Sequence, residues 1–251
     1  MHLVKESESS VALTRILAFI LTGVLLAANG HTTAGTDTLD DLFVRDYIRE
    51  LGHQLAKRLP GDERSWEFEV IRENQGGSTH EPMAIPERHI FVPAALILAV
   101  ENEAELAGML AHSMAHVAAG AGVDCAVIPG TAHGMSVLLS SQDLETRRTC
   151  ELEADRTAVK TVSAAGYDPI GLLEYIRRTQ SPATGRSNTY SMLPPREERI
   201  AALEEELADL PTGGRWSSSE FAAVQKKVRQ LTVPAHVGLK NPPTLFREDE
   251  Q

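Results

Sequence analysis

A succession of helical segments, interrupted by one short stretch of β-type residues, restricts the fold more than any other feature. From Thr38 to Leu59 apolar residues recur at intervals of three and four, as in an amphipathic helix, and Pro60 and Gly61 follow. Capping residues, prolines and glycines delimit further predicted helices at about 102–120, 142–164, 168–178, 195–207 and 219–231. Only 5% of residues are aromatic. We therefore expect a mostly helical α+β fold with an aliphatic core.

The short β-type stretch lies between the first two predicted helices. Residues 66–70 alternate between apolar and acidic side chains, and residues 83–92 are again rich in β-type residues. This pattern predicts a small hairpin or sheet. Because a proline cannot donate a hydrogen bond within a central ladder, Pro82 and Pro86 indicate an irregular or edge strand, which can accept a peptide.

The N-terminal region resembles a targeting segment. The run from Ile16 to Ala28 holds 13 apolar and small residues, and Ala28 and Gly30 suit a signal peptidase. As a helix this run would rise about 20 Å, less than the membrane core of about 30 Å. We expect a signal peptide over 1–30, a mature chain that begins near His31, and a periplasmic or secreted location. An uncleaved anchor and a buried core helix are the alternatives.

Charge and composition restrict the partners and the domain organisation. The 24 basic and 35 acidic residues give a net charge of −11, which repels phosphate groups and anionic lipid, so nucleic acid binding is not expected. Peripheral proximity to a membrane is compatible with the N-terminal segment. We expect one domain over residues 31–233 and an extended, proline-rich tail over 234–251.

The chain has two cysteines, Cys125 and Cys150. An exported protein meets oxidising conditions, so we expect a disulfide between them. Two buried free thiols are the alternative.

The sequence AHSMAHVAAG contains the most informative pair of residues. His112 and His116 stand four residues apart on a predicted helix, so both imidazoles leave the same face and can share one metal ion. By itself the pair is a weak indication, because solvated or core-packed histidines also occur at this spacing. On the next predicted helix Glu151 can complete a three-ligand zinc site, and Asp155 can hold a ligating imidazole from behind.

These motifs resemble the zinc metalloendopeptidases (gluzincins) that include the CAAX prenyl endopeptidase, HtpX and BepA. The matching stretches are NEAELAGMLAHSMAH at 102–116, ELEADRTA at 151–158, AAGYDP at 164–169, IFVPAAL at 90–96 and PPREERI at 194–200. The resemblance implies a zincin-like domain with a small sheet against the active-site helices. It implies that His112, His116 and Glu151 bind zinc. It also implies that Asp155 orients one histidine and that Arg199 faces the active site, with a solvated helix residue as the alternative.

The chain departs from the family pattern at residues that would perform hydrolysis. The family motif is H-E-x-x-H, and Ser113 stands where the glutamate, the general base, belongs. Leu193 stands where the family has a histidine that helps to stabilise the oxyanion. Glu87 and Arg88 replace two glycines of the substrate strand. Loss of a base costs about 10² to 10⁴ in rate, and loss of an oxyanion donor about 10² to 10³.

Three functions are compatible with these features. The one that we expect is an exported zinc-binding pseudoprotease that binds peptides, unfolded proteins or envelope proteins. The second is an active zinc endopeptidase of envelope protein quality control that uses an unusual base; Glu105, about 10 Å from His112 along the helix, is too distant for that role. The third is a structural domain whose histidines hold no metal. The sequence indicates neither the substrate nor the oligomeric state.

Overall fold

The computed structural model describes residues 37–60, 65–72, 81–85, 88–119, 141–182, 193–211 and 213–232. All of them belong to one compact unit that begins at Asp37. The expected signal peptide and the expected tail lie outside the described residues, so both stay predictions. Among the described helices, none is both long and apolar enough to cross a membrane.

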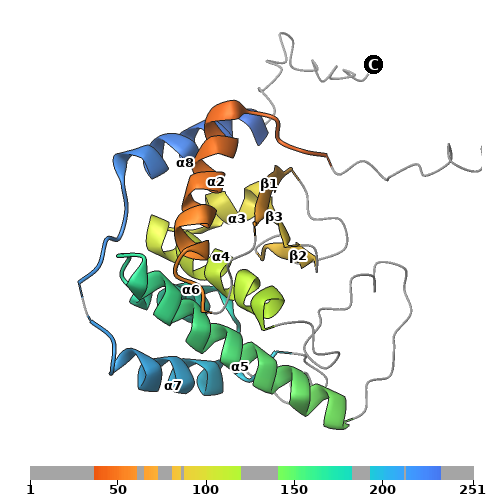
Figure 1. The fold of residues 1–251 in the computed structure, drawn as a ribbon, viewed down its shortest axis with the longest axis vertical. Helices are drawn as coiled ribbons and strands as arrows, with labels where there is room; N and C mark the ends of the chain where they lie inside the picture. Colours follow the sequence, from red (N-terminus) through yellow and green to blue (C-terminus); the bar gives the residue numbers. More distant parts are fainter. Residues whose placement is uncertain are drawn as a thin grey trace, which may run out of the picture. The chain divides into compact units, whose positions relative to one another are not determined.

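Helices make up most of the described chain, as Figure 1 shows. The elements are α2 (Leu42–Ala56), β1 (Glu67–Ile71), β2 (Met83–Ile85), β3 (His89–Pro93), α3 (Ala94–Ala99), α4 (Glu103–Ala118), α5 (Ser141–Ala164), α6 (Ile170–Thr179), α7 (Arg196–Leu207) and α8 (Ser219–Thr232). The expected mostly helical α+β fold is confirmed. All of the helices except α3 coincide with the predicted segments to within a few residues.

The strands form one mixed sheet in the order β1-β3-β2. β1 runs parallel to β3 with Phe68 opposite Ile90, and β2 runs antiparallel to β3 with Ala84 opposite Ile90. The run over 83–92 is therefore two strands rather than one irregular strand. β2 is an edge strand of the described sheet, as its neighbouring prolines predict.

The turn between β2 and β3 contains an unusual backbone conformation. Arg88 donates its backbone N–H to the carbonyl of Ile85 at 3.0 Å and has a φ of 64°, in the left-handed region that favours glycine. Its side chain is buried, and its guanidinium carbon lies 5.0 Å from the centroid of the Trp66 ring. This cation–π contact offsets part of a backbone strain of about 1 kcal/mol or more.

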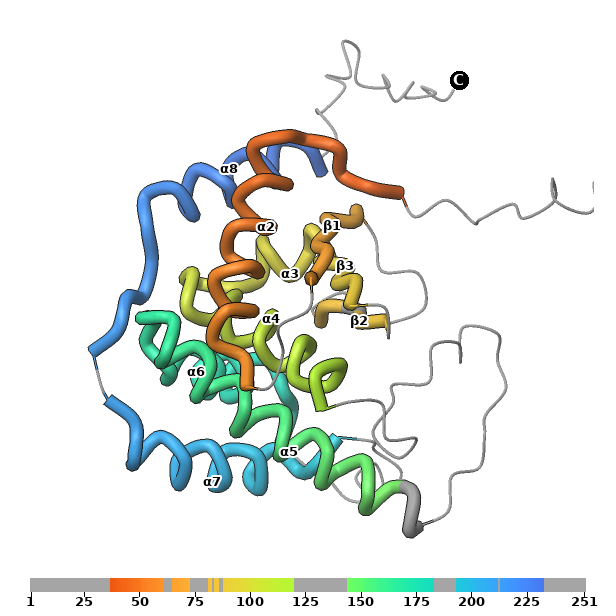
Figure 2. The backbone as a smooth tube through the Cα atoms, viewed as in Figure 1, coloured from red at the N-terminus to blue at the C-terminus, as the bar shows by residue number. Residues whose placement is uncertain are grey.

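α4 is the central helix, and α2, α5, α6 and β2 all pack against it (Figures 1 and 2). The predicted capping pair starts the helix: the Asn102 side chain accepts a hydrogen bond from the Glu105 backbone N–H at 3.0 Å. The Glu105 carboxylate accepts one from the Glu101 backbone N–H at 2.9 Å and forms an ion pair with Arg178 of α6. These contacts hold the first turn of α4 in place.

Two glycines allow α4 and α6 to approach each other closely. A Cβ atom on Gly108 would lie 2.8 Å from the Cβ atom of Leu172, and one on Gly171 would lie 2.6 Å from the carbonyl carbon of Ala104. Both distances are too short for two carbon atoms, so the absence of side chains sets the separation of the two helices.

Candidate metal centre

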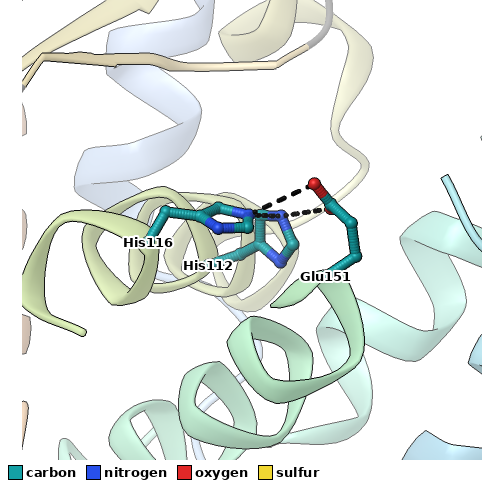
Figure 3. A group of neighbouring side chains, drawn as sticks. All are labelled: His112, His116 and Glu151. Carbon is teal, nitrogen blue, oxygen red and sulfur yellow. Dashed lines mark hydrogen bonds and ion pairs between the residues drawn. The ribbon is translucent and has the colours of Figure 1, made fainter. Parts of the chain in front are cut away.

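Two histidines of α4 and a glutamate of α5 direct their polar atoms at one point between the helices (Figure 3). The Nε2 atoms of His112 and His116 are 3.1 Å apart. The Glu151 carboxylate lies 3.3 Å from His112 Nε2 through one oxygen and 3.5 Å from His116 Nε2 through the other. The structure therefore brings together the three residues that the sequence indicated as ligands.

The spacing of these donor atoms fits a zinc ion. Tetrahedral zinc with bonds of about 2.0 to 2.1 Å separates its ligand atoms by about 3.3 to 3.4 Å. The two nitrogens are 3.1 Å apart, and each lies 3.3 or 3.5 Å from a different oxygen of the Glu151 carboxylate, so an ion between them can be reached by all three side chains. Two imidazoles and one carboxylate also form the donor set of catalytic zinc sites, which leave one coordination position open.

Asp155 lies behind His112, one helical turn after Glu151 on α5. It is fully buried, and its Oδ1 atom is 2.8 Å from His112 Nδ1. This contact places a carboxylate oxygen against the ring nitrogen opposite Nε2 and leaves Nε2 facing the other two donors. Asp155 is thus placed to fix the orientation of this imidazole.

Arg199 of α7 binds the same aspartate. Its Nε and Nη2 atoms donate to the two Asp155 carboxylate oxygens at 2.8 and 2.7 Å, and its Nη1 atom donates to Gln180 Oε1 at 3.2 Å. Because Arg199 is buried, the alternative of a solvated helix residue is wrong. We call the predicted ligands together with Asp155 and Arg199 the donor side of the centre. The bidentate contact joins α7 to this donor side, through Asp155 and then His112.

The electrostatic environment keeps the carboxylates of the centre ionised. Burial favours a higher pKa for both acids. Hydrogen bonds with the histidines nevertheless hold the pKa of Glu151 well below its ordinary value, and the charge of Arg199 holds that of Asp155 down. Burial opposes charge on His112, but Asp155 and Glu151 raise its pKa to about 9. The metal-free site therefore favours a cation, and a divalent ion would displace the imidazole proton.

Ser113, at the position of the general base in the family, points toward the sheet. It is buried, and its hydroxyl donates to the carbonyl of Pro82 at 3.4 Å. Pro82 directly precedes β2, so this contact joins the helix with the two histidines to the edge strand. Glu105, considered above as a substitute base, is bound by Arg178 and the Glu101 backbone at the start of α4.

A cavity of about 360 Å³ lies beside the centre. The described residues that line it come from the segment before β2, from α4, from α6, from the segment before α7 and from α7 itself, and they include Glu81, Met109, Tyr175, Ile176, Leu193 and Arg199. Met109 is one turn before His112 on α4. This cavity was not predicted from the sequence, because Met109, Tyr175 and Ile176 have the spacing of ordinary core residues.

Of three further predicted residues, one is described and two lie outside the described residues. Cys150, directly before Glu151, is disulfide-bonded. Cys125 and Glu87 lie outside the described residues, so the bridge between Cys125 and Cys150 stays a prediction.

Comparisons with known proteins agree with this geometry. Over 202 residues the chain is 24% identical to a protein of Vibrio cholerae serotype O1 named "Putative beta-barrel assembly-enhancing protease". The matched region covers 69% of this chain and 41% of that relative, so the chain spans about two-fifths of the relative's length. The sequence profile of Peptidase family M48 matches residues 44–128 and 121–207, which is more than half of the chain and includes α4 and α5. The chain therefore belongs to peptidase family M48, a family of zinc metallopeptidases.

Proposed function

We propose that the protein is an exported, zinc-binding member of the family that binds peptides or unfolded proteins and hydrolyses them negligibly. The observation that carries this proposal is the environment of Ser113. Its hydroxyl donates to the Pro82 carbonyl, and a serine hydroxyl cannot accept and pass on a proton near neutral pH as a carboxylate does.

The donor side of the centre supports metal binding. His112, His116 and Glu151 would hold the ion, and Asp155 keeps the His112 ring in the orientation that this requires. When bound, zinc polarises a carbonyl group and makes water more acidic. The chain then lacks a carboxylate at residue 113 to move the proton and a histidine at residue 193 to meet the developing oxyanion.

The position of β2 supports peptide binding. This strand is at the edge of the described sheet and packs on α4. An extended peptide can add to such an edge through main-chain hydrogen bonds, which need no catalytic group. Loss of hydrolysis therefore leaves the binding step possible.

The predicted leader and the relative support an envelope location. The name of the Vibrio cholerae protein refers to the assembly of β-barrels, which are membrane-spanning structures of bacterial outer membranes. Because this chain spans about two-fifths of that relative, its own partner is proposed only as a class, a peptide or an unfolded envelope protein.

The zinc content and casein hydrolysis of one purified sample test the proposal. We expect stoichiometric zinc and no chelator-sensitive hydrolysis. Glu151→Gln should lose zinc, whereas Glu153→Gln is a matched control that should retain it, because Glu153 is exposed on the same helix and pairs with Arg156.

Two other results would favour the competing functions. Chelator-sensitive cleavage that survives Ser113→Ala would indicate an active endopeptidase with its base elsewhere. A protein without zinc, whose melting temperature does not respond to zinc or chelator, would indicate a structural domain.

A further inference from the structure

We propose that the cavity beside the metal centre receives one large apolar side chain of the bound peptide, and that Leu193 makes the site selective for such a side chain. This inference rests on the proposed function, because its ligand is the peptide that the function requires. Beyond the proposed function, it names the class of peptide that binds and the residue of this chain that determines the preference.

The cavity lies where a peptide on β2 would direct its side chains. Glu81 lines the cavity and directly precedes Pro82, whose carbonyl accepts the hydrogen bond from Ser113. β2 packs on α4, and Met109 of α4 forms another part of the lining. Alternate side chains of a peptide added to β2 would face α4. One of them would therefore lie at the cavity.

Four apolar side chains form one part of the cavity lining, and Glu81 is the anionic residue among the described lining residues. Met109, Tyr175 and Ile176 are buried, and Leu193 adds an aliphatic side chain. The one buried cation among these described lining residues, Arg199, has its charge compensated by the bidentate contact with Asp155. A volume of about 360 Å³ is at the lower end of the range for ligand pockets. These properties fit a single large apolar side chain.

Leu193 connects the loss of catalysis with this selectivity. A histidine at this position, as the family resemblance implies, would place a polar ring in the wall of the cavity. Leucine removes that polar group and extends the apolar surface formed by Tyr175 and Ile176. The replacement that disfavours hydrolysis thus favours retention of an apolar side chain.

Fluorescence anisotropy of labelled peptides on the zinc-loaded full chain tests this inference. The peptides are identical except for one position that is Leu, Phe, Ala or Asp. Burial of three additional carbon atoms predicts that the Leu peptide binds about tenfold to a hundredfold more tightly than the Ala peptide. The Asp peptide should bind most weakly.

Thr179→Trp blocks the cavity without altering the core. Thr179 is exposed, lines the cavity and is the last residue of α6, where its hydroxyl donates to the Tyr175 carbonyl at 2.8 Å. We expect the variant to lose the preference for Leu over Ala. Thr232→Trp is the matched control, because Thr232 ends α8 with the same type of contact, to Val228 at 2.9 Å, and should keep the preference.

A second pair of variants tests the selectivity residue. Leu193→His should reduce the preference for Leu over Ala at least fivefold, because it returns a polar group to the wall. Leu210→His is the control. Leu210 is also partly buried and is not among the residues that line the cavity.

The outcomes separate this inference from the proposed function. Peptides that bind with equal affinity whatever the variable residue, or whose preference survives Thr179→Trp, would overturn the inference and leave peptide binding intact. If the preference survives Thr179→Trp and this variant, unlike Thr232→Trp, has a lower melting temperature, another part of the chain fills the cavity, and the inference is again overturned. A panel in which no peptide binds would overturn the proposed function and the inference with it.

Discussion

The donor side and the reaction side of the metal centre are built in different ways. On the donor side, α4, α5 and α7 hold His112, Asp155 and Arg199 in one buried chain of contacts. On the reaction side, Ser113 contacts Pro82 directly before the edge strand, and Leu193 lines the cavity. If the protein binds zinc without turnover, as proposed, metal binding and turnover depend on separate groups of residues within the same fold.

The turn at Arg88 on the reaction side has a conformation that favours glycine, the residue that the family resemblance implies at this position. A glycine would adopt its φ of 64° without strain, yet the turn has this conformation with a bulky residue. The contact with Trp66 and the burial of the side chain compensate in part.

The largest effect is expected when the two residues missing from the reaction side, a general base and an oxyanion histidine, are both restored. Ser113→Glu together with Leu193→His should raise casein hydrolysis from a negligible baseline by about 10² or more, since each residue supplies one missing function and the two act as a unit. Ser113→Gln with Leu193→His is the control, because it has the same size without a proton acceptor. Equal rates for the two double variants would show that the deficit lies elsewhere.

A substitution on the donor side should reduce zinc affinity even when the substituted residue does not contact the ion. Arg199→Gln frees Asp155 from its bidentate partner, so we expect about 10- to 100-fold weaker zinc binding and a loss of about 3 to 5 kcal/mol in the free energy of unfolding. Competition with a chromophoric chelator measures the affinity. Arg196→Gln on the same helix should leave it unchanged, and an equal effect of both variants would contradict the assigned role of Arg199.

The predicted disulfide would reinforce the donor side, because Cys150 directly precedes Glu151. A bridge to Cys125 closes a loop that stabilises the fold by roughly 3.5 kcal/mol in the chain-entropy estimate. Denaturant unfolding with and without reductant measures this difference. Two thiols that titrate in the denatured, non-reduced protein would exclude the bridge.

The pH dependence of stability should distinguish the zinc-loaded from the metal-free protein. The folded pKa of His112 is about 9, above its ordinary 6.5. Its contribution to metal-free stability is therefore complete below pH 6.5 and disappears as the pH rises through 9. Zinc binds the neutral imidazole, so the gain in melting temperature from zinc should grow over this range. A gain independent of pH, by differential scanning fluorimetry, would mean that His112 is not a ligand.

Local sequence signals predicted the helices well, and they predicted that His112, His116 and Glu151 lie together. Asn102, Gly166 and Pro169 mark helix ends through hydrogen-bond and backbone constraints that act within a few residues. The spacing of His112 and His116 likewise fixes their common face.

Features that depend on long-range contacts were not predictable in this way. Residue spacing does not encode that β1 pairs in parallel with β3, or that Arg199 meets Asp155 across 44 residues. The cavity was missed for the same reason, because the wall of a pocket and the interior of a core show the same apolar period.

The close contact of Gly108 with Leu172 sets the distance between two helices that line the cavity. Met109 and Ile176 line the cavity from the two helices that this contact holds together. A methyl group on Gly108 would act as a spacer between α4 and α6 and would widen the space between them. If the cavity holds a peptide side chain as proposed, one carbon atom at position 108, which is neither a predicted metal ligand nor part of the described cavity lining, would change the size of side chain that fits.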